Sequence, residues 1–515
     1  MPGKKRHTYV RRQPEQLALH QVVREHLETF LAEVRLRGDG QGLPAFVERE
    51  LREFLTCGSL ARGFARFRCE GCGHEILVAF SCKGRGFCPS CCGRRMAELA
   101  AHLVDEVLGG LPVRQWVLTL PYRLRYALAW DHRLCRRVLA VFVRAITSFE
   151  RRRARLRGFG KGQCGAVTAI QRFGSALNTN VHFHTVAVQG VFTEAADGST
   201  QLMPLPAPTD REVARLLAVV RRRVIRLVRC HGIELENPEA DFEGRDQLRW
   251  ENPGFAAIQG AAVTNRVAIG PRAGANVRRL GGGAVGAAPR PERALHAHLD
   301  GFDLHAAVAV PAGDRRRLEH LCRYILRPPL AQGALELGEG GRIVLRLRRP
   351  WHDGTRALCF EPMELLEKLA AMIPRPRANL LLYHGIFAPH ARERPAAVSR
   401  ARALAGKPAA APGEERCSVR PKSPAEHEPE ASRRTKHFSW AELLRRTFAI
   451  DVLACPGCGG KLRFLAAIEQ RTVVEKILGH LNLPTGPPEA APACQTAWLP
   501  GISPTDDISI LPPID

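Results

Sequence analysis

The sequence lacks a long apolar run and an apolar leader. Nowhere do about 18 apolar residues follow one another, the length that a membrane-spanning helix needs. The start, Met1-Pro-Gly-Lys-Lys-Arg6, has no apolar segment typical of a secretory signal peptide. We therefore expect a cytoplasmic protein with no membrane partner, in which paired cysteines act as metal ligands rather than forming disulfides.

Acidic residues are few relative to basic ones. The 515 residues include 51 Asp and Glu against 76 Lys and Arg, which gives a formal net charge of +25. Such an excess favours a polyanionic partner, and nucleic acid is the commonest. The alternative is a genome of high GC content, which would inflate arginine together with alanine, glycine and proline. The length allows two to four domains and at least one sizeable core.

Tyrosine is also rare. The five tyrosines are Tyr9, Tyr122, Tyr126, Tyr324 and Tyr383. Tyr324 falls in a predicted helix over 314–326, which Pro328-Pro329 must end. It lies roughly 110° from the centre of the apolar stripe of that helix and shares its flank with Arg317, His320 and Arg327. A tyrosine placed for packing would lie on the stripe, so the offset favours a reactive hydroxyl. The alternative is an amphipathic tyrosine at the edge of a core.

The sequence does contain a histidine doublet in an alternating apolar run, over 180–192. Alternation in a strand places His182 and His184 on one face, where two imidazoles can hold one metal. A metal beside a phosphodiester polarises its phosphorus, which a tyrosine hydroxyl can then attack. The alternative is a pair of hydrogen-bonded histidines in a half-buried strand. A second doublet, His296 and His298, lies between a Gly/Pro-rich stretch and the turn-like Asp300-Gly301.

Sixteen cysteines form two groups of paired residues and several single ones. The spacing Cys69-x2-Cys72-x15-Cys88-x2-Cys91 predicts one tetrahedral zinc site, with Cys57, Cys82 and Cys92 left over and His74 as a substitute ligand. The zinc either holds a small domain together or docks it on DNA. Nearby basic residues favour DNA: Arg62, Arg66, Arg68, Lys83, Arg85, Arg94 and Arg95.

Cys455-Pro-Gly-Cys458 is half of a second zinc site or a bare turn. If it binds zinc, it needs two further ligands, for which the candidates are Cys494, Cys417, His437 and His480.

The pattern of elements predicts an α+β protein. Strands are expected at 115–120, 165–173, 180–192, 304–311 and 342–347, and helices within 14–56 and at 129–155, 210–230, 314–326 and 361–373. Residues 270–291 are Gly-, Arg- and Pro-rich and are expected to form a mobile loop. These segments suggest four parts: a helical and zinc-binding domain (1–105), a catalytic domain (110–390) with an insertion at about 195–292, a disordered linker (391–436), and a small module with a loose tail (437–515).

Ordered blocks along nearly the whole chain resemble the rolling-circle transposases of the family named after insertion sequence 91, within the HUH (His-hydrophobic-His) endonuclease class. The resemblance selects His182 and His184 over the second doublet. Some members carry two tyrosines four residues apart on the helix; here His320 fills the earlier position, so the chain resembles the single-tyrosine branch. The blocks are Phe87-Cys-Pro-Ser-Cys91, Pro112–Pro121, the 182–184 doublet, Gly301-Phe-Asp-Leu-His-Ala306, Arg323-Tyr-Ile-Leu-Arg-Pro-Pro329, Tyr383-His-Gly-Ile-Phe-Ala-Pro389 and Cys455-Pro-Gly-Cys-Gly-Gly460.

The resemblance implies an HUH core, an antiparallel sheet flanked by helices. It implies that His182, His184 and a third ligand hold Mg²⁺ or Mn²⁺, and that Tyr324 attacks DNA to leave a 5′-phosphotyrosine and a free 3′-hydroxyl. For the third ligand, Gln171 on the strand expected to pair with the doublet is preferred to His305. Arg327 is expected to hold the attacked phosphate.

The implied partner is DNA, as single-stranded or hairpin transposon ends, in a bacterial nucleoid. A homodimer would supply a second tyrosine; otherwise Tyr324 is reused. The competing hypotheses are a metal-dependent nuclease that uses water, and an inactive or regulatory zinc-dependent DNA-binding protein.

Overall fold

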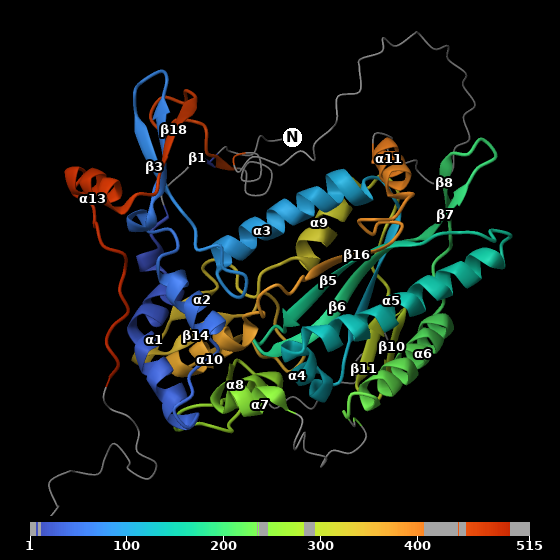
Figure 1. Ribbon diagram of the computed structural model, residues 1–515, viewed down its shortest axis with the longest axis horizontal. Helices are drawn as coiled ribbons and strands as arrows, with labels where there is room; N and C mark the ends of the chain where they lie inside the picture. Colours follow the sequence, from blue (N-terminus) through green and yellow to red (C-terminus); the bar gives the residue numbers. More distant parts are fainter. Residues whose placement is uncertain are drawn as a thin grey trace, which may run out of the picture.

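The computed structural model describes residues 7–8, 12–233, 235, 246–282, 294–405, 441 and 450–494. Within this part, the fold mixes helices with antiparallel sheets (Figure 1). Its largest sheet has seven strands in the order β10-β11-β4-β6-β5-β16, with β12 also paired to β4. These strands are β4 (Val113–Thr119), β5 (Gly165–Phe173), β6 (Thr179–Val188), β10 (His296–Leu299), β11 (Phe302–His305), β12 (Ala309–Val310) and β16 (Leu381–Gly385).

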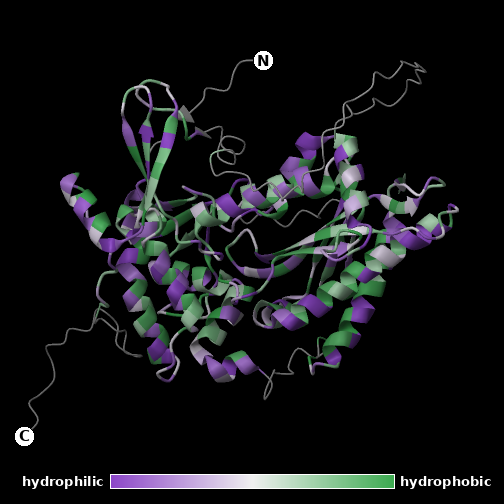
Figure 2. Ribbon diagram, turned by 45° about the horizontal axis from the view of Figure 1, so that its top comes forward, coloured by the Kyte–Doolittle hydropathy of each residue, from purple (hydrophilic) through white to green (hydrophobic). Residues whose placement is uncertain are grey.

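One face of the large sheet packs on two long amphipathic helices. Val181 and Phe183 of β6 point to this face and share a core with α5 (His132–Arg155) and α6 (Asp210–Arg229). Asp131 caps the start of α5, and Thr209 with Glu212 forms a capping box at α6, so both helices begin where the sequence provides a cap. Figure 2 shows hydrophilic and hydrophobic residues alternating along these outer helices.

The opposite face carries the histidine doublet and a second set of helices. Val186 and Val188 of β6 share a core there with Leu318 and Leu321. The covering elements are α3 (Pro89–His102), the π-helical turn η3 (Leu103–Leu108), α9 (Arg315–Ile325) and α11 (Arg394–Ala405); Figure 1 shows α3 and α9 above β5 and β6. The alternation of β6 therefore puts the imidazoles under α9.

A separate core joins the first helices to the middle of the chain. It combines α1 (Ala18–Arg37), α2 (Ala45–Leu55), α8 (Pro253–Val263) and α10 (Pro362–Met372) with a four-stranded sheet. That sheet has the order β13 (Leu335–Leu337), β14 (Ile343–Arg346), β15 (Ala357–Phe360) and β9 (Arg278–Leu280). The shorter elements are η1 (Pro14–Gln16), η2 (Leu60–Arg62), α4 (Tyr122–Trp130), the β7 (Gly190–Glu194) and β8 (Thr200–Pro204) pair, α7 (Gln247–Glu251) and η4 (Glu339–Gly341).

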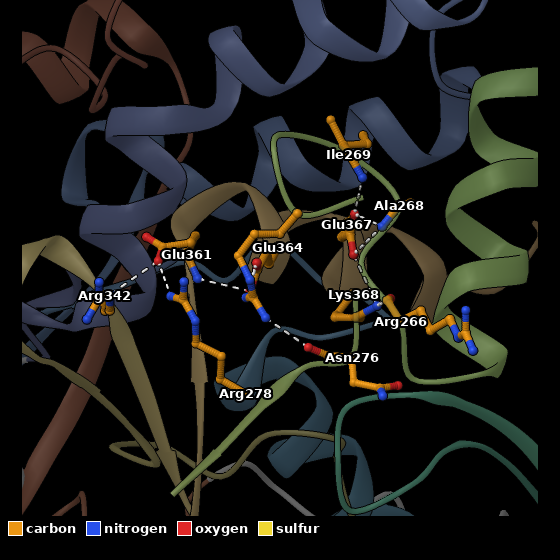
Figure 3. A network of polar contacts seen from close by, with 11 residues as sticks. Arg266, Ala268, Ile269, Asn276, Arg278, Arg342, Glu361, Glu364, Glu367 and Lys368 are labelled. Atoms are coloured by element: carbon orange, nitrogen blue, oxygen red, sulfur yellow. Dashed lines mark hydrogen bonds and ion pairs between the residues drawn. The ribbon is translucent and has the colours of Figure 1, made fainter. Parts of the chain in front are cut away.

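Buried charges fix the loop before β9 onto α10 (Figure 3). Glu367 and Lys368 are fully buried and form an ion pair of 3.1 Å. The Glu367 carboxylate accepts hydrogen bonds from the backbone N–H groups of Ala268 (2.8 Å) and Ile269 (3.1 Å), and the Lys368 ammonium donates to the carbonyl of Arg266. Each buried charge thus has polar partners, as burial requires.

The two ends of the described chain share one small sheet. β2 (Phe64–Cys69) pairs with β3 (Glu75–Ala79) on one side and with β18 (Leu462–Ile468) on the other. α13 (Arg471–His480) packs beneath it, and β1 (His7–Thr8) pairs with β17 (Ile450–Asp451). The segment expected to form an independent C-terminal module therefore completes the N-terminal hairpin.

Several expected boundaries are wrong. Residues 394–405 of the expected linker form α11, which packs on η3; residues 406–440 and 442–449 lie outside the described residues. The expected insertion at 195–292 includes α6, which is part of the sheet core, because its apolar stripe fits the sheet face. The expected loop at 270–291 contains β9, and 283–290 lie outside the described residues. None of the described helices is long and apolar enough to cross a membrane.

Candidate active site and zinc clusters

The doublet lies in the centre of the large sheet, on its α9 face. His182 is opposite Thr119 of β4 and Gln171 of β5, and His184 is opposite Val117 and Ala169. The two imidazole centroids are 4.8 Å apart. Their exposed fractions are 8% and 3%, so both rings are removed from bulk water.

Each imidazole uses its Nδ1 atom for a hydrogen bond within the protein. His182 Nδ1 is 2.8 Å from the carbonyl of Asn180, which can only accept, so the lone pair of this ring lies on Nε2. His184 Nδ1 is 2.7 Å from Nε2 of the Gln115 amide, which can only donate, so in this orientation the lone pair of His184 lies on Nδ1 and its hydrogen on Nε2. Rotation of the Gln115 amide by 180° would bring Oε1 to Nδ1 and move the lone pair to Nε2. The Nε2 atom of His184 is buried and has no hydrogen-bond partner within the described residues. His182, with Nδ1 donating to the protein and the lone pair on Nε2, has the arrangement of a metal-binding histidine, and His184 has it once the Gln115 amide is rotated.

Burial keeps both imidazoles neutral. Desolvation lowers the pKa of His182 to about 4 and, with help from the neighbouring His182 and Arg327, lowers the pKa of His184 to about 2. Neutral imidazole is the form that binds a metal. The donor set thus fits a divalent cation at neutral pH.

Tyr324 lies next to the doublet. Its ring centroid is 5.7 Å from that of His184, and the two rings are nearly perpendicular. Half of its side chain is exposed, which is unusual for a tyrosine on a packed helix and leaves the phenol open to solvent. The Arg327 guanidinium is 4.5 Å from the Tyr324 centroid and 5.6 Å from the Phe173 centroid. The structure therefore brings together the predicted residues His182, His184, Tyr324 and Arg327.

Gln171 has a role that its sequence position did not suggest. Its Nε2 donates to the carbonyls of Ile325 (2.8 Å) and Tyr324 (3.2 Å), so it holds the C-terminal end of α9 against β5. Its Oε1 is buried without a hydrogen-bond partner among the described residues, which leaves an oxygen ligand available. His305, the rival ligand, is separated from His184 by β4, because both pair with Val117. Two strand spacings are about 10 Å, so Gln171 is the nearer candidate to the doublet.

A cleft of about 1460 Å³ opens onto the doublet and the tyrosine. Arg279 of β9 and Trp351 and His352 of the connection between β14 and β15 also line it. The second doublet also belongs to this region: His296 lines the cleft and lies 2.7 Å from Asp303, while the side chain of His298 is 62% exposed. Tyr324 is therefore reached from solvent through this cleft.

The cysteines form two four-sulfur clusters, and the predicted single site is wrong in its pairing. Cys88 and Cys91 join Cys57 and Cys82, whereas Cys69 and Cys72 join Cys455 and Cys458. Within each cluster the four Sγ atoms lie within 4.8 Å of one another. Cys57 and Cys82 thus complete the site of Cys88 and Cys91, and the C-terminal pair completes the site of Cys69 and Cys72. Cys494 and His480, two of the suggested partners of Cys455 and Cys458, lie within the described residues and do not belong to this cluster. The other two, Cys417 and His437, lie outside the described residues.

The cluster geometry fits zinc. Measured Sγ–Sγ contacts are 3.4 Å between Cys82 and Cys91, 3.5 Å between Cys69 and Cys458, and 3.6 Å between Cys72 and Cys455. Tetrahedral zinc with Zn–S bonds of about 2.3 Å requires sulfurs about 3.8 Å apart. In the first cluster, hydrogen bonds from neighbouring thiols, above all Cys82, lower the pKa of Cys57, which favours a thiolate ligand.

Two family models match the chain. Residues 165–395 match the family described as "Putative transposase", and residues 22–120 match the transposase zinc-binding domain of insertion sequence 91. These matches define a transposase with structural zinc. Both models describe transposases, and the second names insertion sequence 91, so the resemblance to that family is confirmed. Neither the curated proteins nor the solved structures gave a match.

Proposed function

We propose that the protein is a rolling-circle DNA transposase with an HUH core, which nicks one DNA strand through a covalent 5′-phosphotyrosine on Tyr324. The observation that carries this proposal is the half-exposed Tyr324 ring, 5.7 Å from His184 on the same sheet face as His182. The phenol ring thus lies beside two buried, neutral imidazoles, and the Nε2 atom of His184 has no hydrogen-bond partner among the described residues.

The protein would hold Mg²⁺ or Mn²⁺ through His182, His184 and Gln171 Oε1, and this cation would polarise the scissile phosphate. Gln171 also fixes α9, so the residue would set the position of Tyr324 relative to the doublet. Arg327, stacked on the Tyr324 ring, would bind a phosphate oxygen.

In the reaction, the Tyr324 oxygen forms a bond to phosphorus while the bond from phosphorus to the 3′-oxygen breaks. The phenol gives up its proton to solvent, and the leaving 3′-oxygen takes one up. The number of phosphoester bonds stays the same, so no ATP is needed. A 3′-hydroxyl that later attacks the phosphotyrosine reverses the sequence and joins strands. Because the chain has a single tyrosine on α9, two successive transfers require release of Tyr324 or the partner copy in a homodimer.

The test is incubation with single-stranded DNA and Mn²⁺, followed by denaturing electrophoresis. We expect a protein–DNA adduct that is absent in Tyr324→Phe. Tyr122→Phe is the matched control, because Tyr122 is 56% exposed and does not line the cleft. Cleavage without an adduct would instead indicate a nuclease that uses water, and binding without cleavage a DNA-binding protein.

A further inference from the structure

A second pocket lies at the C-terminal end of α9 and reaches two residues of the site just described. It has a volume of about 510 Å³ and is bordered by α3, the end of β5 and the segment after α9. Gln171 and Arg327 belong to its lining. The pocket therefore continues the surface that surrounds Tyr324 toward the zinc-binding domain.

Three arginines line this pocket, and no acidic residue does: Arg85, Arg95 and Arg327. Arg172 also borders it, but alternation along β5 turns its side chain to the opposite face, where it donates to the carbonyl of Ala129 (2.8 Å). None of them forms an ion pair with another described residue. Arg95 donates to the carbonyl of Lys83 (3.5 Å) and Arg85 to the carbonyl of Ala378 (2.5 Å), which are neutral groups. Like charges that share a half-buried pocket repel one another and lose solvation, and an anion would relieve both costs.

The surroundings of these arginines also favour the binding of an anion in this pocket. Burial and the neighbouring Arg95 lower the pKa of Arg85, although Glu50 lies near enough to offset part of this effect. The pocket thus combines guanidinium groups with a lining that contains no carboxylate.

Apart from Gln171 and Asn379, the rest of the lining is mostly apolar. Met96 and Leu99 of α3 face Phe173 of β5 across the pocket. Ligand sites of about 300–1,000 Å³ with apolar walls and a few polar groups accept small planar molecules. Aromatic and guanidinium planes together are the usual stacking partners of an unpaired base. A nucleotide has both parts, a phosphate for the arginines and a base for the apolar walls.

We propose that this pocket holds one nucleotide of the single-stranded DNA substrate, beside the phosphate that Tyr324 attacks. Its phosphate would lie against Arg85 and Arg95, and its base against Phe173 and Met96. The inference rests on the proposed function, because only a DNA strand would connect the pocket to the tyrosine. It gives the zinc-binding domain a direct part in substrate binding, since α3 supplies one wall.

The first experiment measures DNA affinity without chemistry. Full-length protein carrying Tyr324→Phe is titrated into a fluorescent 12-nucleotide oligothymidylate by anisotropy, with no added Mg²⁺ or Mn²⁺. Arg95→Ala should weaken binding about tenfold and reduce the salt dependence of log K by about 0.7. Arg94→Ala is the matched control, because Arg94 is the exposed neighbour on α3 outside the pocket. Equal affinities of the two variants, with equal zinc content and thermal unfolding, would overturn the proposal.

The second experiment locates the base. Oligothymidylates with 5-iodouracil at successive positions are photo-crosslinked to the same protein, and the crosslinked peptides are mapped by mass spectrometry. We expect one position to label the peptide of Phe173 or Met96; labelling only elsewhere would overturn the proposal. Thymidine monophosphate should compete at lower concentration than inorganic phosphate, and equal competition would reduce the pocket to a simple anion site.

The two proposals fail in different ways. If the wild-type protein forms no adduct with DNA but Arg95→Ala alone loses affinity, the pocket stands and the transfer chemistry falls. If the adduct forms normally and Arg95→Ala binds like Arg94→Ala, the chemistry stands and the pocket does not bind DNA.

Discussion

The position of single side chains in β6 decides what this protein can do. Because side chains alternate along a strand, His182 and His184 point to the α9 face while Phe183 between them points to the α5 face. A shift of one residue in register would bury both imidazoles against α5 and α6 and remove them from Tyr324.

Substitution of the doublet should abolish the chemistry. We expect His184→Ala to lose adduct formation with Mn²⁺, because loss of one metal ligand typically removes activity at least 100-fold. His298→Ala should retain it, since that imidazole is mostly exposed at the far edge of the sheet. The measurement is adduct yield over time, and equal loss in both variants would contradict the assignment of the doublet.

The buried imidazoles also make stability depend on pH. Their pKa values, about 4 and about 2, lie below that of an unfolded histidine, so only the unfolded chain takes up these protons as the pH falls below about 6.5. The free energy of unfolding should therefore decrease from pH 6.5 toward 4, at up to about 1.4 kcal/mol per pH unit for each imidazole.

The control for this pH effect is His182→Gln/His184→Gln, measured by urea unfolding without added Mg²⁺ or Mn²⁺. The variant keeps the other histidines and both cysteine clusters, so it should show a shallower decline over the same range. A decline as steep as in the parent protein would assign the pH dependence to other groups.

At the scale of elements, α10 shows how a helix of mixed sequence can be buried. Its residues Glu364, Glu367 and Lys368 are almost inaccessible to solvent, and each charge is matched by the loop before β9. This pairing fixes β9 and the cleft wall that contains Arg279 and Trp351.

Removing one of these charges should be costly. We expect Lys368→Met to reduce the free energy of unfolding by about 3–5 kcal/mol, because it leaves the Glu367 carboxylate buried without its cation. Lys476→Met is the control, a lysine on α13 outside this core. Chemical denaturation compares the two, and a small change in Lys368→Met would show that the carboxylate is satisfied by the backbone of Ala268 and Ile269 alone.

Elements were also what the sequence predicted best. β5 has the predicted ends, α9 differs by one residue at each, and β4 and α10 differ by one or two, because alternation, helical periodicity and proline stops are local signals. The angle of Tyr324 on its helix favoured a side chain off the apolar stripe, and its ring is half-exposed in the structure. The hydrogen bonds of Gln171 to α9 could not be predicted, since they depend on how a helix crosses a strand 150 residues away.

At the scale of the whole molecule, chain ends that are distant in sequence share their structure. The sequence has three Cys-x-x-Cys pairs of the same spacing, at 69/72, 88/91 and 455/458, and the spacing does not reveal which of them share a zinc site. The pair nearest in sequence to 69/72 was the wrong partner. β18 and the C-terminal cysteines complete the N-terminal hairpin instead. The first helices likewise share their core with α8 and α10, so the expected domain 1–105 does not have a separate core.

The paired clusters predict two zinc ions per chain. Cys455→Ser/Cys458→Ser should retain one, and Cys57→Ser/Cys82→Ser should retain the other, as counted by atomic emission on purified protein. Cys72 and Cys458 are exposed whereas Cys57, Cys82, Cys88 and Cys91 are buried, so a chelator should remove zinc from the split cluster first. One ion in the wild type, or the reverse order of loss, would contradict this arrangement.

The split cluster has a consequence for how the polypeptide is made. Cys72 and Cys455 are 383 positions apart, and Cys69 and Cys458 are 389 apart. During translation the pair Cys69 and Cys72 leaves the ribosome first and provides two of the four ligands of this site. The other two ligands become available only after Cys455 and Cys458 have been synthesised. A polypeptide that ends before Cys458 cannot form the four-sulfur site, so a complete site indicates that synthesis has passed this residue.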